Sequence, residues 1–155
     1  MLEAHGVRTL IDVRRIPRSR HNPQFNNDAL PQSLAARGIA YLHMPELGGL
    51  RRARPDSVNT AWRNAGFRGF ADYMQTPKFA AALTRLIEIG RAAPAAIMCA
   101  EAVPWRCHRS LIADALVARG FPVEHILSAS NRKPHQITPF AKLRGDVITY
   151  SVNDQ

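Results

Sequence analysis

The chain has 155 residues, 46% of them hydrophobic, which is enough for one domain with a sizeable core. It carries 21 Lys and Arg against 12 Asp and Glu, a formal net charge of +9, and most of the basic residues are arginine. No apolar run approaches the ~18 residues of a membrane span, and the N-terminus lacks the parts of a secretory signal peptide. We therefore expect one soluble, cytoplasmic domain over residues 1–155, with no membrane partner.

Hydrophobic periodicity and turn residues predict alternating strands and helices. The expected strands are at 7–13, 39–44, 95–100 and 123–127, and the expected helices are at 27–38, 78–91 and 107–119, with short helical turns between 57 and 76. Asn27 or Asp28 is the expected cap of the first helix, and Gly38 its stop. Thr76 and Pro77 form a cap-plus-proline start for the second helix. The tail, 131–155, contains a Gly-Asp turn signal between two short extended runs, which predicts a hairpin.

Strands that are nearly all apolar and separated by helices favour a parallel sheet covered on both faces. The expected fold class is therefore α/β, a three-layer α/β/α domain with a mostly parallel, Rossmann-like sheet. In such sheets ligands bind at the carboxyl ends of the strands, so the loops that follow the first three strands should converge on one site. These loops are 12–20, 46–52 and 99–109.

Several motifs in chain order resemble an uncharacterised bacterial and archaeal family, the domain-of-unknown-function family four-eight-eight. The segments that carry the resemblance are "DVRRIPRSR" with "FN", "LGGLR", "GFADYM", "MCAEAVPWRCHRSLIAD" and "HQITPFA". The resemblance implies an α/β fold and supplies no activity. Members of that family begin one strand and one helix earlier, with a Thr-Ile-Gly-His-Ser loop in the same cleft, and "MLEAHGV" resembles the end of that helix. The resemblance therefore leaves two alternatives: either the start is truncated relative to the family, or this chain lacks the family's first strand and part of the site.

An acid and a base close the first strand. Asp12 and Arg14 face the same side of an extended chain, where the carboxylate stays ionised and either orients a ligand hydroxyl or forms a structural ion pair with the arginine. Arg15, Arg18 and Arg20 can clamp a phosphate, although a solvated basic loop would have the same residues.

The second loop offers Glu46 and the pair Gly48 and Gly49, which allows close backbone approach to a ligand or simply a tight turn. Phe70, Tyr73 and Trp105 can stack a nucleobase, although the spacing of Phe70 and Tyr73 is equally typical of core residues.

The segment Cys99 to Ser110, "CAEAVPWRCHRS", joins a strand to a helix and contains both cysteines. With Pro104 just before the helix, Cys107, His108 and Arg109 should occupy its first turn, where unpaired N–H groups bind anions and lower a thiol pKa. Cys107 is then a thiolate nucleophile or, as we favour, a buried packing residue. Free thiols are the simpler expectation, and a thiol-based redox pair with Cys99 is a third possibility.

Two other chemistries fit this segment poorly. A phosphatase loop needs an arginine six positions after its cysteine, and Trp105 stands there after Cys99. A zinc site needs three or four convergent ligands, which Cys99, Cys107 and His108 supply only if the loop curls back, so we expect no metal and no cofactor.

Glu101 is the best candidate for a general acid or base, because desolvation at the edge of an apolar strand raises a carboxyl pKa. Asp12 on a neighbouring strand can complete a catalytic carboxylate pair, while the alternative is that Glu101 forms a salt bridge with Arg14 or Arg109. Two functions remain open: an enzyme acting on a nucleotide or nucleic-acid substrate, or a non-catalytic module that binds nucleic acid or another anion. The sequence does not indicate an oligomeric state.

Overall fold

The computed structural model describes residues 1–101, 103 and 106–152. Its elements are η1 (Glu3–His5), β1 (Thr9–Asp12), η2 (Pro23–Phe25), α1 (Leu30–Ala35), β2 (Ala40–His43), η3 (Pro45–Leu47), α2 (Ala65–Tyr73), α3 (Pro77–Ala92), β3 (Ala95–Met98), α4 (Arg109–Ala118), β4 (Glu124–Ser128), β5 (Asn131–Pro134), β6 (Lys142–Arg144) and β7 (Val147–Thr149). The α/β fold class is confirmed. Within these residues no helix has the length and apolar character needed to cross a membrane.

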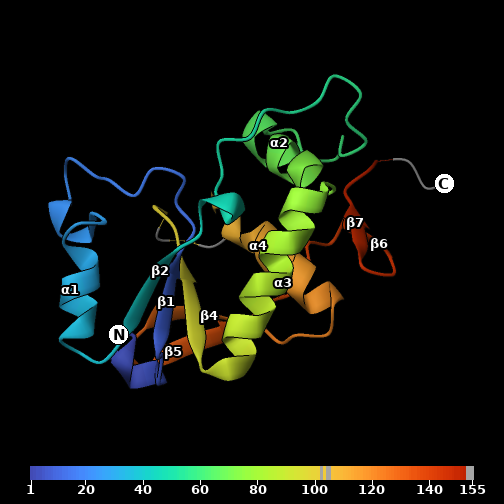
Figure 1. The fold of residues 1–155 in the computed structure, drawn as a ribbon. Coiled ribbons are helices and arrows are strands. Elements are labelled where there is room, and N and C mark those ends of the chain that lie inside the picture. The colour runs from blue at the N-terminus through green and yellow to red at the C-terminus, as the bar shows by residue number, and fades with distance from the viewer. Residues whose placement is uncertain (102, 104–105, 153–155) are drawn as a thin grey trace.

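A three-stranded parallel sheet in the order β2-β1-β3 forms the centre of the molecule. Alternate residues of β1 point to opposite faces, as the pleat requires. Leu10 packs with Leu30 and Leu34 of α1 on one face, while Ile11 belongs to the larger cluster formed with α3 and α4 on the other face. Helices therefore cover both faces (Figure 1). Three strands do not establish a Rossmann-like order, so that finer resemblance stays a prediction.

The strand expected at 123–127 forms as β4 but does not join the parallel sheet. It pairs antiparallel with β5 in a separate two-stranded sheet. Only two residues separate β4 from β5, which is enough for a hairpin, whereas a parallel pair needs a crossover of a dozen residues or more. Both ends of β4 are exposed, so this strand is not the fully buried kind that lies in the middle of a covered sheet.

Helix boundaries differ from expectation in two places. Neither Asn27 nor Asp28 caps α1, which starts after Ala29 without a side-chain cap. Pro31 in the first turn carries no N–H, so one donor that a cap would satisfy is missing. The last α-helix starts at Arg109 rather than at residue 107, so Cys107 and His108 precede its first turn.

The start of α3 is as predicted, because Thr76 accepts a hydrogen bond from the Phe79 N–H at its N-cap. In the tail, β6 and β7 pair as a hairpin around Gly145 and Asp146.

Candidate functional site

The loops after the three parallel strands meet at the carboxyl edge of the sheet. Gly48 lies so close to the first loop that an added Cβ would be 3.0 Å from the backbone nitrogen of Arg15. At Gly49 an added Cβ would be 3.1 Å from Nδ1 of His108, in the third loop. The two glycines are thus explained by contact between the loops themselves, and the expected convergence is observed.

Asp12 and Arg14 form a buried ion pair at the end of β1. Two guanidinium nitrogens of Arg14 donate to the two carboxylate oxygens, at 2.9 and 2.8 Å, and the Arg14 backbone N–H donates at 3.1 Å. Tyr41 donates its hydroxyl to Oδ2 at 2.5 Å, and Arg14 also donates to the Phe25 carbonyl at 2.6 Å. Burial alone would raise the pKa of the Asp12 carboxyl, but the hydrogen bonds from Arg14 and Tyr41 outweigh it and hold the pKa below its usual value.

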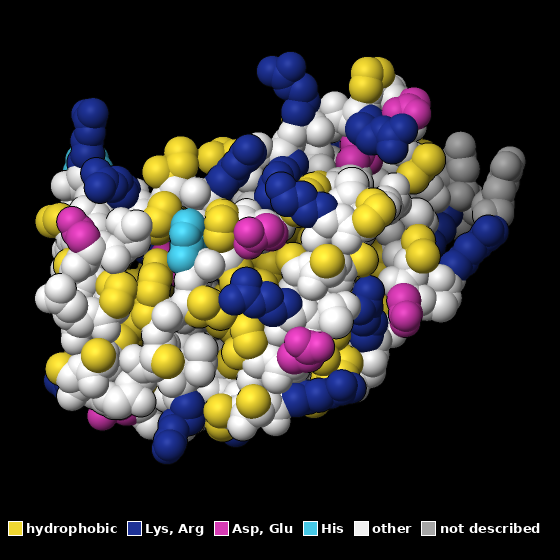
Figure 2. Space-filling view, viewed as in Figure 1, with side chains coloured by type: hydrophobic (Ala, Val, Ile, Leu, Met, Phe, Trp, Pro, Cys, Tyr) yellow, Lys and Arg dark blue, Asp and Glu magenta, His cyan; other side chains and the backbone are white. Residues whose placement is uncertain are grey.

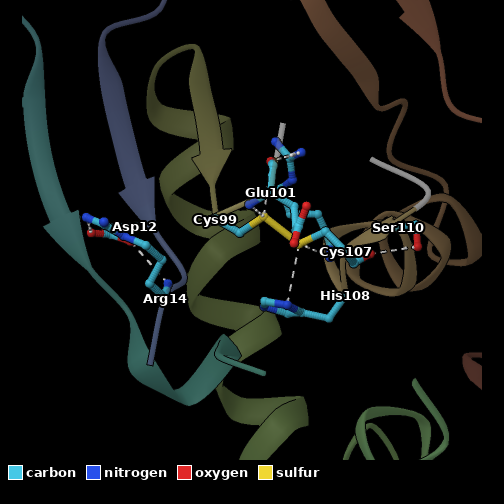
Figure 3. Close-up of a disulfide and its surroundings, with 8 residues drawn as sticks. Asp12, Arg14, Cys99, Glu101, Cys107, His108 and Ser110 are labelled. Carbon is cyan, nitrogen blue, oxygen red and sulfur yellow. Dashed lines mark hydrogen bonds and ion pairs between the residues drawn. A yellow bond between two sulfur atoms is a disulfide. The ribbon is translucent and has the colours of Figure 1, made fainter. Parts of the chain in front are cut away.

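This pair lies apart from the third loop. Asp12 shares the face of β1 that carries Leu10 and α1, whereas Cys99 belongs to the cluster on the opposite face. Figure 3 shows the Asp12 and Arg14 side chains pointing away from Glu101. The structure therefore does not assemble a pair of carboxylates from Asp12 and Glu101, nor a salt bridge between Glu101 and Arg14.

Cys99 and Cys107 are joined as a disulfide across a sequence separation of eight, which corrects the expectation of free thiols. Both residues are buried, and the sulfur of Cys107 also accepts a hydrogen bond from the backbone N–H of Arg109 at 3.4 Å. Two cysteines cannot form a framework of several disulfides, but they can form one local bridge between the end of a strand and the start of a helix.

The His108 side chain lies between the second loop and the core. Its ring centroid is 4.9 Å from that of Phe70, and Nδ1 is 3.5 Å from the Cys107 sulfur. Burial is the main reason why the pKa of His108 falls to about 4; the carbonyl groups of Leu47 and Val13 oppose that shift without forming hydrogen bonds of good geometry. Its Nε2 is buried without a partner among the described residues. His108 is therefore a neutral imidazole at pH 7.

Glu101 is exposed to solvent, so the burial on which its proposed acid or base role depended is absent. Arg109 donates to the backbone carbonyl of Glu101 at 2.9 Å, and no ion pair joins the two side chains in the described part of the chain. Burial lowers the pKa of Arg109, and the charge of Glu101 opposes that shift. The Nε of Arg109 is buried and has no hydrogen-bond partner within the described ranges of the chain.

The second loop packs against α2 through several side-chain contacts. Tyr73 donates its hydroxyl to the backbone carbonyl of Glu46 at 2.6 Å, and the Arg51 guanidinium lies 3.7 Å over the Tyr73 ring. Arg51 also donates to the Gly48 carbonyl at 3.0 Å. At Gly69 an added Cβ would be only 2.0 Å from the Arg51 carbonyl oxygen, so this loop requires glycine on the helix beneath it. Tyr73 and Glu46 thus position the loop.

The basic edge, as we call it, consists of five arginines on the first two loops and one just after the second loop: Arg15, Arg18, Arg20, Arg51, Arg52 and Arg54. Figure 2 shows dark-blue side chains along this upper side of the molecule, and others spread over the rest of the same face. Arg54 is paired with Asp56, whereas Arg15, Arg18, Arg20 and Arg52 are in none of the ion pairs that the described residues form. Phe70 is buried in the core, and Pro104 and Trp105 lie outside the described residues.

A second polar cluster was missed from the sequence. Asp114 of α4 is fully buried and accepts hydrogen bonds from three side chains, those of His135, Thr138 and Tyr150. His135 in turn contacts His125 of β4. The tail motif "HQITPFA" was the available signal, but nothing local in the sequence places it against α4. No group of three or more His, Cys, Asp or Glu residues with metal-binding geometry occurs in the ranges that the structure describes.

Comparison with known proteins identifies a family. The model of the family described as Domain of unknown function DUF488 matches residues 1–116. The chain belongs to DUF488. No curated protein and no solved structure matches it. The DUF488 match spans all three parallel strands and their loops and ends within α4, so β4 with His125 and the tail with His135 and Tyr150 lie beyond the matched residues. Because the family's function is unknown, membership assigns no activity.

Proposed function

We propose that this DUF488 protein binds a phosphate-bearing ligand, a nucleotide or a segment of nucleic acid, at the basic edge. The observation that carries the proposal is the first loop: residues 14–21, "RRIPRSRH", contain four arginines and no acid, and Arg15, Arg18 and Arg20 are exposed. They follow a parallel strand at its carboxyl end, which is where ligands of α/β sheets bind.

The chemistry of arginine supports phosphate as the ligand group. A guanidinium presents a planar set of donors that matches phosphate oxygens, and it stays charged at every physiological pH. The two loops are also joined, because Arg15 donates to the Leu50 carbonyl at 2.9 Å. A ligand would therefore meet arginines from both loops on one pre-organised surface, which reduces the entropy lost on binding.

Binding without catalysis is the function that the geometry supports best. Asp12 has all its oxygens engaged by Arg14 and Tyr41, and Arg14 is occupied by Asp12 and Phe25, so we assign this pair to positioning the first loop.

An enzyme acting on the same class of ligand is the second candidate. It is favoured by the position of Glu101, whose backbone carbonyl accepts a hydrogen bond from Arg109; because this carboxylate is exposed, an acid or base role would require the bound ligand to bury it. In that case Arg109 would hold the phosphate, Glu101 would be the acid or base, and the sulfur pair with His108 would form the floor of the site.

The test is binding of a fluorescent single-stranded oligonucleotide and of a labelled nucleotide, followed by anisotropy at several salt concentrations. The double variant R18Q/R20Q removes two exposed charges from the basic edge. The matched control, R8Q/R85Q, removes two exposed charges from the start of β1 and from α3. Each phosphate contact to a single strand contributes about 0.7 to the salt slope, so two lost contacts should lower it by about 1.4.

We expect R18Q/R20Q to weaken binding at least about tenfold, the counterpart of about 1.4 kcal/mol, and the control to leave affinity and slope nearly unchanged. Equal losses in the two variants would mean that net charge alone attracts the ligand, which contradicts a site at the basic edge. The variant Glu101→Gln separates the two candidates: a binding module keeps its affinity and has no turnover to lose, whereas the enzyme keeps its affinity and loses conversion of the ligand.

A further inference from the structure

The cluster around Asp114 contains a chain of hydrogen bonds that ends on a half-buried histidine. Asp114 accepts from the Thr138 N–H at 3.0 Å, the Thr138 hydroxyl at 2.7 Å and the Tyr150 hydroxyl at 2.8 Å. Its fourth partner is Nε2 of His135, at 2.7 Å. The Asp114 carboxylate acts only as an acceptor toward these four donors. The proton in the hydrogen bond between Asp114 and His135 is therefore on Nε2 of His135.

The chain continues from His135 to His125. Nδ1 of His135 lies 2.7 Å from Nε2 of His125, and the His135 side chain is only 7% exposed. A neutral imidazole has one donor and one acceptor nitrogen. In a neutral His135, Nε2 donates to Asp114 and Nδ1 accepts, so the proton between the two rings belongs to Nε2 of His125. The remaining nitrogen, Nδ1 of His125, then carries a lone pair that accepts no hydrogen bond from the residues that the structure describes.

Basic residues lie near the His125 ring. Lys133 is the residue directly opposite His125 in the β4–β5 ladder, so the two side chains share one face. The acidic neighbour Glu124 points to the other face and is paired there with Arg132 at 3.1 Å. The pKa of His125 is lowered first by burial of the ring, and the nearby guanidinium of Arg109 lowers it further. His125 is thus a neutral ring near two basic residues, Lys133 and Arg109, and it is partly exposed to solvent.

We propose that Nδ1 of His125 is a proton-accepting site for an anionic ligand that carries a hydroxyl group, such as a phosphate monoester or inorganic phosphate. The ligand's hydroxyl donates to Nδ1, and its charged oxygens face Lys133 and Arg109. His135 and Asp114 are positioning residues, because they fix which nitrogen of His125 carries the proton. This site is formed by α4, β4 and the tail, so it goes beyond the binding proposed at the basic edge, and each can fail without the other.

The experiment is long-range ¹H–¹⁵N NMR of the full chain with ¹⁵N-labelled histidine, first at pH 7 and then with inorganic phosphate added. We expect His125 to carry its proton on Nε2 and to show an unprotonated Nδ1, whose ¹⁵N resonance moves upfield toward the hydrogen-bonded and protonated range as phosphate is added. A His125 protonated on Nδ1 at pH 7, or an Nδ1 resonance that millimolar phosphate does not move, would overturn the proposal.

Two variants test the positioning role. In Asp114→Asn the amide can donate as well as accept, so His135 is no longer fixed and His125 should become a mixture of tautomers. The control is His5→Gln, because His5 contacts the Ser128 carbonyl on the same strand but takes no part in the chain; it should leave the His125 tautomer and its phosphate response unchanged. A His125 that stays in one tautomer in Asp114→Asn would contradict the positioning role. If this variant does not fold, the tautomer and phosphate response of the unmodified chain still decide the proposal.

Discussion

Replacement of Asp12 by asparagine should destabilise the protein strongly. Asp12 is fully buried and Arg14 is 7% exposed, so the substitution removes the counter-charge of a guanidinium that cannot reach water. The amide of asparagine would also turn one donor toward the donors of Arg14. Breaking a buried ion pair in this way costs about 3–5 kcal/mol. The double variant D12L/R14M removes both charges and should recover most of that loss, because well-packed apolar residues often replace such pairs without penalty.

Urea unfolding at pH 7, followed by circular dichroism, measures these changes in the free energy of unfolding. The pKa of Asp12 is lowered in the folded state, so its carboxylate contributes stability above the unfolded pKa of about 3.9, and this contribution is lost as pH falls through the folded pKa. The variant Asp12→Asn should therefore lack this part of the acid dependence. The control, Asp56→Asn, breaks an exposed pair and should cost no more than about 1 kcal/mol. A loss below about 1 kcal/mol in Asp12→Asn as well would refute the reasoning.

Two further predictions concern the second loop. Gly69→Ala should cost at least about 2 kcal/mol, because the new methyl group meets the Arg51 carbonyl at 2.0 Å; Gly90→Ala, which has open space in α3, should instead stabilise the chain by about 0.5–1 kcal/mol. Thermal unfolding compares the two, and equal effects would contradict the close packing of the loop on α2. Leu50 is 74% exposed with a φ of 60°, so Leu50→Gly should raise the free energy of unfolding by about 1 kcal/mol. A destabilised Leu50→Gly would mean that the leucine side chain makes contacts that outweigh its backbone strain.

Local sequence signals predicted those parts of the fold that depend on neighbouring residues. The apolar spacing and the Thr76–Pro77 start located α3, and short apolar runs located the three parallel strands. Because parallel strands end at the same edge of a sheet, the three loops that follow them were predicted to meet there. The close contacts of Gly48 and Gly49 confirm that prediction.

The predictions that failed depend on distant partners or on fine geometry. The sequence could not show that β4 would pair with β5, nor that Asp12 would be enclosed by Tyr41 from another strand. The Asp114 cluster is the clearest case, since its members are separated by up to 36 residues and meet only after the tail folds onto α4. Histidines that look isolated in the sequence carried no signal of that contact.

The most direct measurement of the proposed function is a crystal structure of the full chain grown with a nucleoside monophosphate. The account predicts a phosphate group between the loops at 14–20 and 51–54, with Arg18 or Arg20 and an arginine of the second loop donating to its oxygens. A nucleotide bound only elsewhere on the molecule, with the arginines of the basic edge free in solvent, would contradict it.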